Sequence, residues 1–432
     1  MAYLSRTFSL QLKSLALFRI GLACVIGLAL FPINANAAIF EPELSDSWLF
    51  QSLPFLPIGS INAFPPVIFL LIGLLVFFNL RLLTGYQTRL TTFLCFCLCG
   101  LAYLWDVGHF RLLGEALLPI LFWAIFLPLG AQYSLDSAMN PEVELLPRSV
   151  LSSATIALLI QQCFNYWLSE RSAIFPWLTL SPMGNSSALS YSVLMAGILA
   201  PFLLLVTDKR GIFRCLAITL CSLGHIVAVL FWGQGIIPAL FAISTWLTFL
   251  PESVWRYFEQ RIDHPARRGL TIYYDVDCGF CKKVVHVLRT LLILPGTPLL
   301  TAQSDDSICA DMEAYNSWVV VDWQQKRHYK FEAIAYICGL SPGLNAISPL
   351  LRWAPVMAAG TRFYEMIANN RKRAGLFTRF LKFKPDWLKR PAFENFALGV
   401  LIATYGAVNF SRVIRVFSRT IAIIIRWISI IS

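Results

Sequence analysis

The chain has 432 residues, of which 57% are hydrophobic and 14% are charged, and its formal net charge is +11. Soluble domains have about 25% charged residues, so this composition excludes a protein that is soluble throughout, and it also excludes a disordered one. The positive charge does not predict nucleic-acid binding, because many basic residues lie at the ends of apolar stretches, where they meet anionic lipid headgroups.

The charged residues divide the sequence into three parts. Residues 1–250 contain 11 Lys and Arg and 10 Asp and Glu, residues 251–393 contain 20 and 13, and residues 394–432 contain 4 Arg and 1 Glu. This distribution predicts a multi-pass α-helical membrane domain, then a water-soluble domain, then an apolar helical tail.

Eight apolar stretches precede residue 251, each close to the length at which a helix crosses about 30 Å of hydrocarbon. They predict about eight transmembrane helices, at residues 11–31, 66–83, 88–105, 116–132, 149–168, 187–206, 213–232 and 234–250. Three basic residues, Arg6, Lys13 and Arg19, lie before or in the first part of the first apolar stretch, and the small residues 35–37 follow it. The stretch is therefore either an uncleaved helix, which we favour, or a signal peptide. In an uncleaved helix, Arg19 is expected to extend its side chain to the membrane interface.

Basic residues are concentrated in alternate connections between these stretches. Residues 32–64 contain three acidic residues and no Lys or Arg, whereas Lys209, Arg210 and Arg214 follow the sixth stretch. The positive-inside rule therefore places the N-terminus and residues 251–393 on the cytoplasmic side of a cell inner membrane.

Residues 269–373 have the pattern of an α/β domain. A β-rich run leads to the pair Cys278 and Cys281, and apolar residues at helical spacing follow. The order of strand, Cys-x-x-Cys motif and helix predicts a thioredoxin-like domain. Its expected elements are strands at 270–274 and 317–322 and helices at 282–294 and 331–338.

Two segments follow this domain, a basic linker at 374–393 and an apolar tail at 394–432. Four arginines of the tail lie at offsets 0, 3, 7 and 14 from residue 412, on one face of a helix. This helix is expected to lie in the membrane interface, and a second crossing in a hairpin is the alternative.

The Cys-x-x-Cys motif predicts redox chemistry. Backbone N–H groups and the dipole at a helix N-terminus favour a thiolate, so Cys278 is expected to be the nucleophile and Cys281 the resolving thiol. Lys282 and Lys283 strengthen this effect, and Asp277 opposes it. Inert thiols or half of a zinc site are the alternatives, but the other Cys and His residues lack the paired spacing of structural zinc sites, so no metal is predicted.

The membrane part contains three ionisable candidates for a site. His225 lies inside the seventh stretch, where such a residue belongs either to a functional site or to a hydrogen-bonded core. Asp106 and His109 lie at the outer end of the third stretch and are either interfacial residues or part of a site.

Residues 270–373 resemble the DCC family of thiol-disulfide oxidoreductases. The resemblance is carried by residues 274–281, with the sequence Tyr-Asp-Val-Asp-Cys-Gly-Phe-Cys, and by residues 318–322, 331–334 and 364–371. It implies a thioredoxin-like fold, and it places Asp275 and Asp277 in the active site beside the two cysteines.

Residues 11–258 resemble the HTTM domain, a membrane module related to vitamin K-dependent γ-carboxylase. The resemblance is carried, in order, by residues 15–21, 126–136, 213–214, His225 and 249–255. This resemblance makes a vitamin K-like quinone the candidate cofactor. The carboxylase uses a lysine base between a tyrosine and a tryptophan, and the matching residues 166–177 contain no lysine, so γ-carboxylation is not expected.

These features together predict a membrane-bound thiol-disulfide oxidoreductase. In a reducing cytosol its resting form is a dithiol, which would reduce a protein disulfide or a membrane quinone-type acceptor. One alternative is a membrane enzyme acting on a quinone-like or lipid substrate, with the dithiol as an auxiliary reductant. The other is a non-catalytic anchor or scaffold. The expected partners are the lipid bilayer and a thiol or disulfide protein or a quinone, and no nucleic acid.

Overall fold

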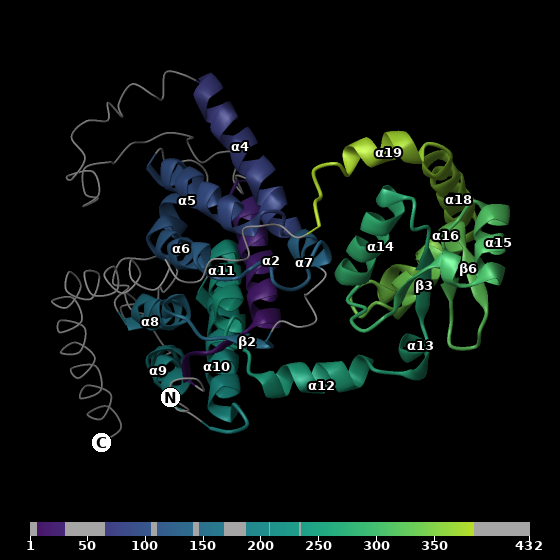
Figure 1. Cartoon of the computed structure of the whole chain (residues 1–432). Coiled ribbons are helices and arrows are strands. Elements are labelled where there is room, and N and C mark those ends of the chain that lie inside the picture. The colour runs from purple at the N-terminus through teal and green to yellow at the C-terminus, as the bar shows by residue number, and fades with distance from the viewer. Residues whose placement is uncertain are drawn as a thin grey trace. The chain divides into compact units, whose positions relative to one another are not determined.

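Figure 1 shows the computed structural model of the chain, which describes residues 7–30, 65–104, 110–140, 147–167, 187–206, 208–232 and 235–383. Residues 35–37, Asp106, His109 and the predicted tail at 394–432 lie outside the described residues. The chain divides into two compact units. The helical unit contains the described residues of 1–129 and 147–253, and the sheet unit contains those of 130–146 and 254–389.

Each of the eight predicted apolar stretches overlaps a helix of the helical unit. These helices are α2 (Leu12–Ala29), α4 (Pro65–Thr84), α5 (Thr88–Leu104), α6 (Phe110–Ile125), α8 (Ser153–Trp167), α9 (Ser187–Leu205), α10 (Ile212–Trp232) and α11 (Ile236–Leu247). A short antiparallel pair, β1 (Leu10–Gln11) and β2 (Ser149–Val150), precedes α2 and α8.

Length and hydropathy qualify fewer of these helices as membrane spans. Among the described residues, three helices are long and apolar enough to cross a membrane, at 12–29, 66–84 and 212–231. A fourth is added if α11 and α12 (Glu252–Ile262) form one broken span. Several apolar helices are therefore able to span a membrane, and the count of eight crossings stays a prediction.

The helix predicted at 116–132 is displaced along the chain, because α6 covers Phe110–Ile125. A proline disfavours the helical conformation of the residue before it. Pro128 therefore prevents the helix from continuing through Leu127, and the chain turns at this point.

Polar side chains connect the segments of the helical unit. Nδ2 of Asn79 donates to the carbonyl oxygen of Ala23 at 2.9 Å, and Nη1 of Arg19 donates to that of Leu129 at 3.0 Å. Arg19 is only 1% exposed. Its guanidinium is thus held by a protein carbonyl, instead of extending to the membrane interface as predicted.

The sheet unit contains α7 (Leu135–Ala138) and most of α12, then α13 (Pro265–Arg268), β3 (Thr271–Tyr274), α14 (Gly279–Leu291), β4 (Leu299–Thr301), η4 (Ala302–Ser304), α15 (Asp306–Tyr315), β5 (Val319–Val321), β6 (Arg327–Tyr329), α16 (Lys330–Leu340), η5 (Asn345–Ile347), α17 (Ser348–Leu351), α18 (Ala354–Asn369) and α19 (Arg371–Phe377). The four elements predicted from the sequence correspond to β3, α14, β5 and α16. The strands β4 and β6, with three residues each, were not predicted. β5 is equally short, but it was predicted because it lies in a longer apolar run at 318–321.

One four-stranded sheet organises this unit, with the order β4-β3-β5-β6. β3 and β4 are parallel, with Ile272 opposite Leu299, and β5 is antiparallel to both β3 and β6. The helix α14 forms the crossover between the two parallel strands, as parallel pairing requires.

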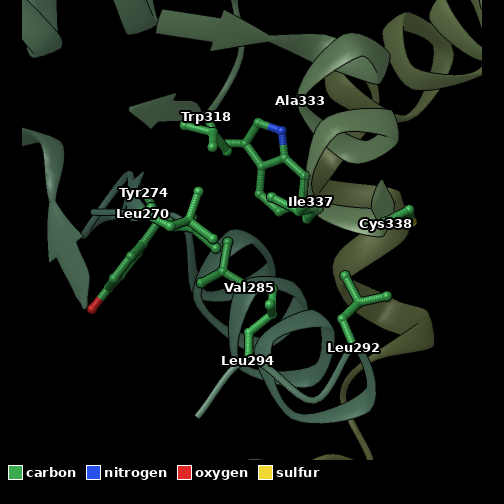
Figure 2. Packing of buried hydrophobic residues seen from close by; sticks show 11 residues of the cluster. Leu270, Tyr274, Val285, Leu292, Leu294, Trp318, Ala333, Ile337 and Cys338 are labelled. Carbon is green, nitrogen blue, oxygen red and sulfur yellow. The ribbon is translucent and has the colours of Figure 1, made fainter. Parts of the chain in front are cut away.

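The strand residues alternate between two apolar clusters on opposite faces of the sheet. On one face, residues of β3 and β5 pack with residues of α14 and α16, and Figure 2 shows this cluster: Leu270, Ile272, Tyr274, Val285, Leu292, Leu294, Trp318, Val320, Ala333, Ile337 and Cys338. On the other face, Val319 and Val321 pack with Ile308 and Met312 of α15. Because Val285 of α14 is fully buried against β3, the N-terminus of α14 is fixed at the carboxyl end of this strand.

Candidate functional site

Cys278 and Cys281 lie at the start of α14, on the connection that follows β3. Cys278 is the N-cap residue of α14, and its Sγ accepts a hydrogen bond from the backbone N–H of Cys281 at 3.2 Å. The two sulfurs are joined in a disulfide, with Cα atoms 5.2 Å apart, and both residues are half-buried. The predicted Cys-x-x-Cys pair is therefore close enough to cycle between dithiol and disulfide.

The helix N-terminus gives the Cys278 sulfur an environment that suits a thiolate. The first N–H groups of a helix have no partner within the helix, and they carry the positive end of its dipole. The N–H of Cys281 is one of these groups, and it points at Sγ of Cys278. The same N–H would stabilise the negative charge that develops when the disulfide is reduced.

Asp275 and Gln303 hold the loop before Cys278 in position. Oδ1 of Asp275 accepts hydrogen bonds from the N–H of Asp277 at 3.1 Å and from Nε2 of Gln303 at 2.9 Å. In return, Oε1 of Gln303 accepts from the N–H of Val276 at 3.3 Å. The backbone of Asp275 also contributes, because its carbonyl accepts from the N–H of Cys278 at 3.3 Å. Asp275 thus positions the loop through its oxygen acceptors.

Sequence reasoning did not identify Gln303, which lies in η4 directly after β4. The carboxyl ends of parallel strands meet at one edge of a sheet, and β4 is the parallel neighbour of β3. A correct prediction of β4 would have placed Gln303 beside the motif.

We expect Asp275→Ala to slow thiol-disulfide exchange about 10-fold, because it removes two hydrogen bonds that order the loop. Asp275→Asn keeps an oxygen acceptor at the same place, and it should retain most of the activity. The measurement is the single-turnover rate of the full chain with each substitution. An Asn variant as slow as the Ala variant would show that the carboxylate acts through its charge or its proton instead.

Asp277 precedes Cys278, and its side chain is exposed. The hydrogen bond that orders this residue comes from its backbone N–H to Asp275. A role of its carboxylate in handling protons, implied by the resemblance to the DCC family, stays a prediction.

The chain after α19 covers the basic side of α14. Nζ of Lys283 donates to the carbonyl oxygen of Thr378 at 2.8 Å. The ring of Phe383 lies 5.2 Å from Nζ of Lys282 and 5.4 Å from the ring of His286. Burial under this segment, together with the positive charges of Arg289 and Lys282, lowers the pKa of His286 from 6.5 to about 4.

This lowered pKa makes the stability of the sheet unit depend on pH. Between pH 6.5 and 4 the unfolded chain binds a proton at His286 that the folded chain does not bind, so stability falls as the pH falls. The ring is only half-buried, and solvent screens part of the effect. Between pH 7 and pH 5 we expect the wild type to lose about 1 kcal/mol more stability than His286→Gln. Thermal unfolding of both proteins at the two pH values checks this, and equal losses would contradict it.

His225 of α10 lies in a second cluster, inside the helical unit. Its Nε2 is 2.7 Å from Oη of Tyr166 in α8, and this Oη accepts a hydrogen bond from Nε1 of Trp246 in α11. Alongside, Nε2 of Gln162 donates to Oγ1 of Thr245 at 3.1 Å. All five residues are buried. The cluster joins three helices by satisfied hydrogen bonds, and this arrangement favours the hydrogen-bonded core over a ligand site.

Asp106 and His109 lie outside the described residues. Within the described ranges, no group of three or more His, Cys, Asp or Glu side chains is arranged to hold a metal ion.

Comparison with known proteins adds one finding. Residues 272–376 match the family model described as DCC1-like thiol-disulfide oxidoreductase, and this region contains the whole Cys278 site. The match supports a thiol-disulfide oxidoreductase and does not extend to the helical unit, for which the HTTM resemblance stays a prediction. No curated protein and no solved structure gave a match.

Proposed function

We propose that this protein is a membrane-bound thiol-disulfide oxidoreductase, with a thioredoxin-like domain in which Cys278 attacks and Cys281 resolves. The observation that carries the proposal is the Cys278–Cys281 disulfide at the N-terminus of α14, inside the region that matches the oxidoreductase family. The order β4-β3-β5-β6, with α14 as the crossover, supports the thioredoxin-like assignment.

The reaction transfers two electrons and two protons. The Cys278 thiolate attacks one sulfur of the acceptor disulfide, which breaks the acceptor S–S bond and forms a mixed disulfide. The Cys281 thiolate then attacks Sγ of Cys278 and releases the second acceptor thiol. The products are the Cys278–Cys281 disulfide and a reduced acceptor. The N–H of Cys281 stabilises Cys278 as the attacking thiolate and again as the leaving group.

The direction of transfer follows from the proposed location. The positive-inside pattern supports a cytoplasmic sheet unit, and a reducing cytosol keeps the resting site as a dithiol. The protein would therefore act as a reductant of a protein disulfide. A membrane quinone-type acceptor would receive the same two electrons and two protons.

The test uses the full chain, because α7, from residues 130–146, packs against α14 within the sheet unit. The chain is reduced, freed of reductant and mixed with oxidised glutathione as the probe. We expect one disulfide reduced per chain, with formation of the Cys278–Cys281 disulfide and no such transfer by Cys278→Ser. Cys309→Ser, which removes another thiol of the same unit, is the matched control and should behave as the wild type.

Other outcomes would favour the alternatives. Transfer to a quinone probe that persists in Cys278→Ser would point to an enzyme site in the helical unit, with the dithiol as its auxiliary. A reduced chain that transfers no electrons to either probe would overturn the proposal, and the non-catalytic anchor or scaffold would be the remaining alternative.

A further inference from the structure

The last described part of the sheet unit, residues 371–383, carries basic and large apolar side chains together. We call it the basic–aromatic segment. Five of its residues are Lys or Arg, and it contains no Asp or Glu. Its outward side chains are Lys372, Arg373, Leu376, Phe377, Arg379, Phe380 and Lys382. Phe377 is 80% exposed and Leu376 is 66% exposed.

The segment is anchored to the sheet unit by its inner side. Leu381 is buried, the carbonyl of Thr378 accepts from Nζ of Lys283, and Nη2 of Arg371 donates to the carbonyl oxygen of Asn316 at 3.0 Å. These contacts fix which side faces outward. Leu376 and Phe377 are therefore held toward solvent by a packed structure.

This combination of side chains fits a membrane interface better than other partners. Contiguous exposed apolar residues mark interaction sites. Aromatic rings favour the headgroup level of a bilayer, and Lys and Arg near the surface are attracted to anionic lipids. An anionic bilayer matches both the basic and the apolar side chains, and the same chain contains helices that are long and apolar enough to span a membrane.

We propose that the basic–aromatic segment docks on anionic lipid headgroups, with Leu376 and Phe377 inserted at the interface and the basic side chains on the phosphates. The docking would also determine how far the dithiol lies from the membrane surface. Lys283, which contacts the segment, lies five residues after Cys278, about 7.5 Å along the helix axis. Docking would therefore keep the N-terminus of α14 close to the membrane surface. The lipid-binding inference does not depend on the proposed redox function.

The experiment places an environment-sensitive fluorescent amino acid at position 377 of the full chain, in nanodiscs whose lipids carry a quencher on their acyl chains. Discs of phosphatidylcholine are compared with discs that also contain phosphatidylglycerol. We expect quenching that requires phosphatidylglycerol and decreases at high ionic strength. Lys372→Gln/Arg373→Gln should lower the docking equilibrium constant about 30-fold, since each basic residue contributes about 5-fold.

Matched controls keep the proposal open to refutation. The same fluorophore at Trp323, which is exposed in the turn between β5 and β6, should not be quenched. The pair Lys326→Gln/Arg352→Gln removes as much charge elsewhere and should have no effect. Quenching at position 377 that does not depend on phosphatidylglycerol or on ionic strength, or no quenching in either disc, would overturn the proposal. In a separate measurement, a photocrosslinking amino acid at position 377 that labels a protein instead of a lipid would also overturn the proposal.

Discussion

Cys278→Ser is expected to lower the rate of thiol-disulfide exchange by about 10³-fold or more, whereas Cys281→Ser is expected to stop the reaction halfway. A serine hydroxyl cannot replace the thiolate as the nucleophile, so removal of the attacking group abolishes the first step. Without Cys281, the mixed disulfide on Cys278 has no resolving thiol and accumulates. Non-reducing electrophoresis and mass spectrometry of the full chain, incubated with a disulfide probe, measure both results.

The two cysteines differ in their environment, and this makes their assignment testable. Cys278 is the N-cap residue, and its sulfur receives the N–H of Cys281, whereas Cys281 lies within the first turn. If Cys278→Ser forms the stable mixed disulfide and Cys281→Ser does not, the roles are reversed. Cys309→Ser and Cys338→Ser, which alter the other two thiols of the sheet unit, should leave both the rate and the trapping unchanged.

Tyr166→Phe is expected to destabilise the helical unit by about 2–6 kcal/mol, although it removes a single oxygen atom. Oη of Tyr166 is the shared partner of Nε1 of Trp246 and Nε2 of His225. Removal of this oxygen leaves two buried polar groups without that hydrogen bond, and each costs about 1–3 kcal/mol. Thermal unfolding of the purified full chain in detergent, compared with the wild type, gives the change.

A second tyrosine provides the control for this prediction. Tyr86 follows α4 and is half-buried, so Tyr86→Phe should change stability by less than about 1 kcal/mol. A Tyr166→Phe protein that is as stable as the wild type but defective in a reaction with a quinone or lipid would contradict the structural role. It would also favour the alternative in which His225 belongs to a functional site.

Residues 130–146 change how the dithiol unit has to be studied. The capping box of α7, in which Ser134 and Ser137 bond each other's backbone N–H groups, forms a compact turn. This turn packs against α14, so a part of the chain about 140 residues before the motif belongs to the unit that holds Cys278. A fragment that begins near residue 262 would lack this contact. Experiments on the isolated region would therefore measure an incomplete unit.

Local sequence patterns were sufficient to predict the elements that carry the chemistry. Long apolar stretches predicted the helices of the helical unit, because hydrophobicity over a helix length is a strong local signal. The β-rich run before Cys278 and the helical spacing after it predicted β3 and α14. Asp275, Cys278 and Cys281 lie in one loop and one helical turn, so their proximity follows directly from the sequence.

The partners of these residues were decided by tertiary structure alone. Gln303 reaches Asp275 because β4 pairs in parallel with β3, and His225 meets Tyr166 because α8 and α10 both pack against α9 and their side chains reach each other. The pKa of His286 is lowered because the chain returns over α14 near Phe383. Such contacts join residues that are 28 to 97 positions apart, and no periodic pattern specifies them. They depend on which faces pack together, and that is settled by the burial of apolar surface over the whole unit.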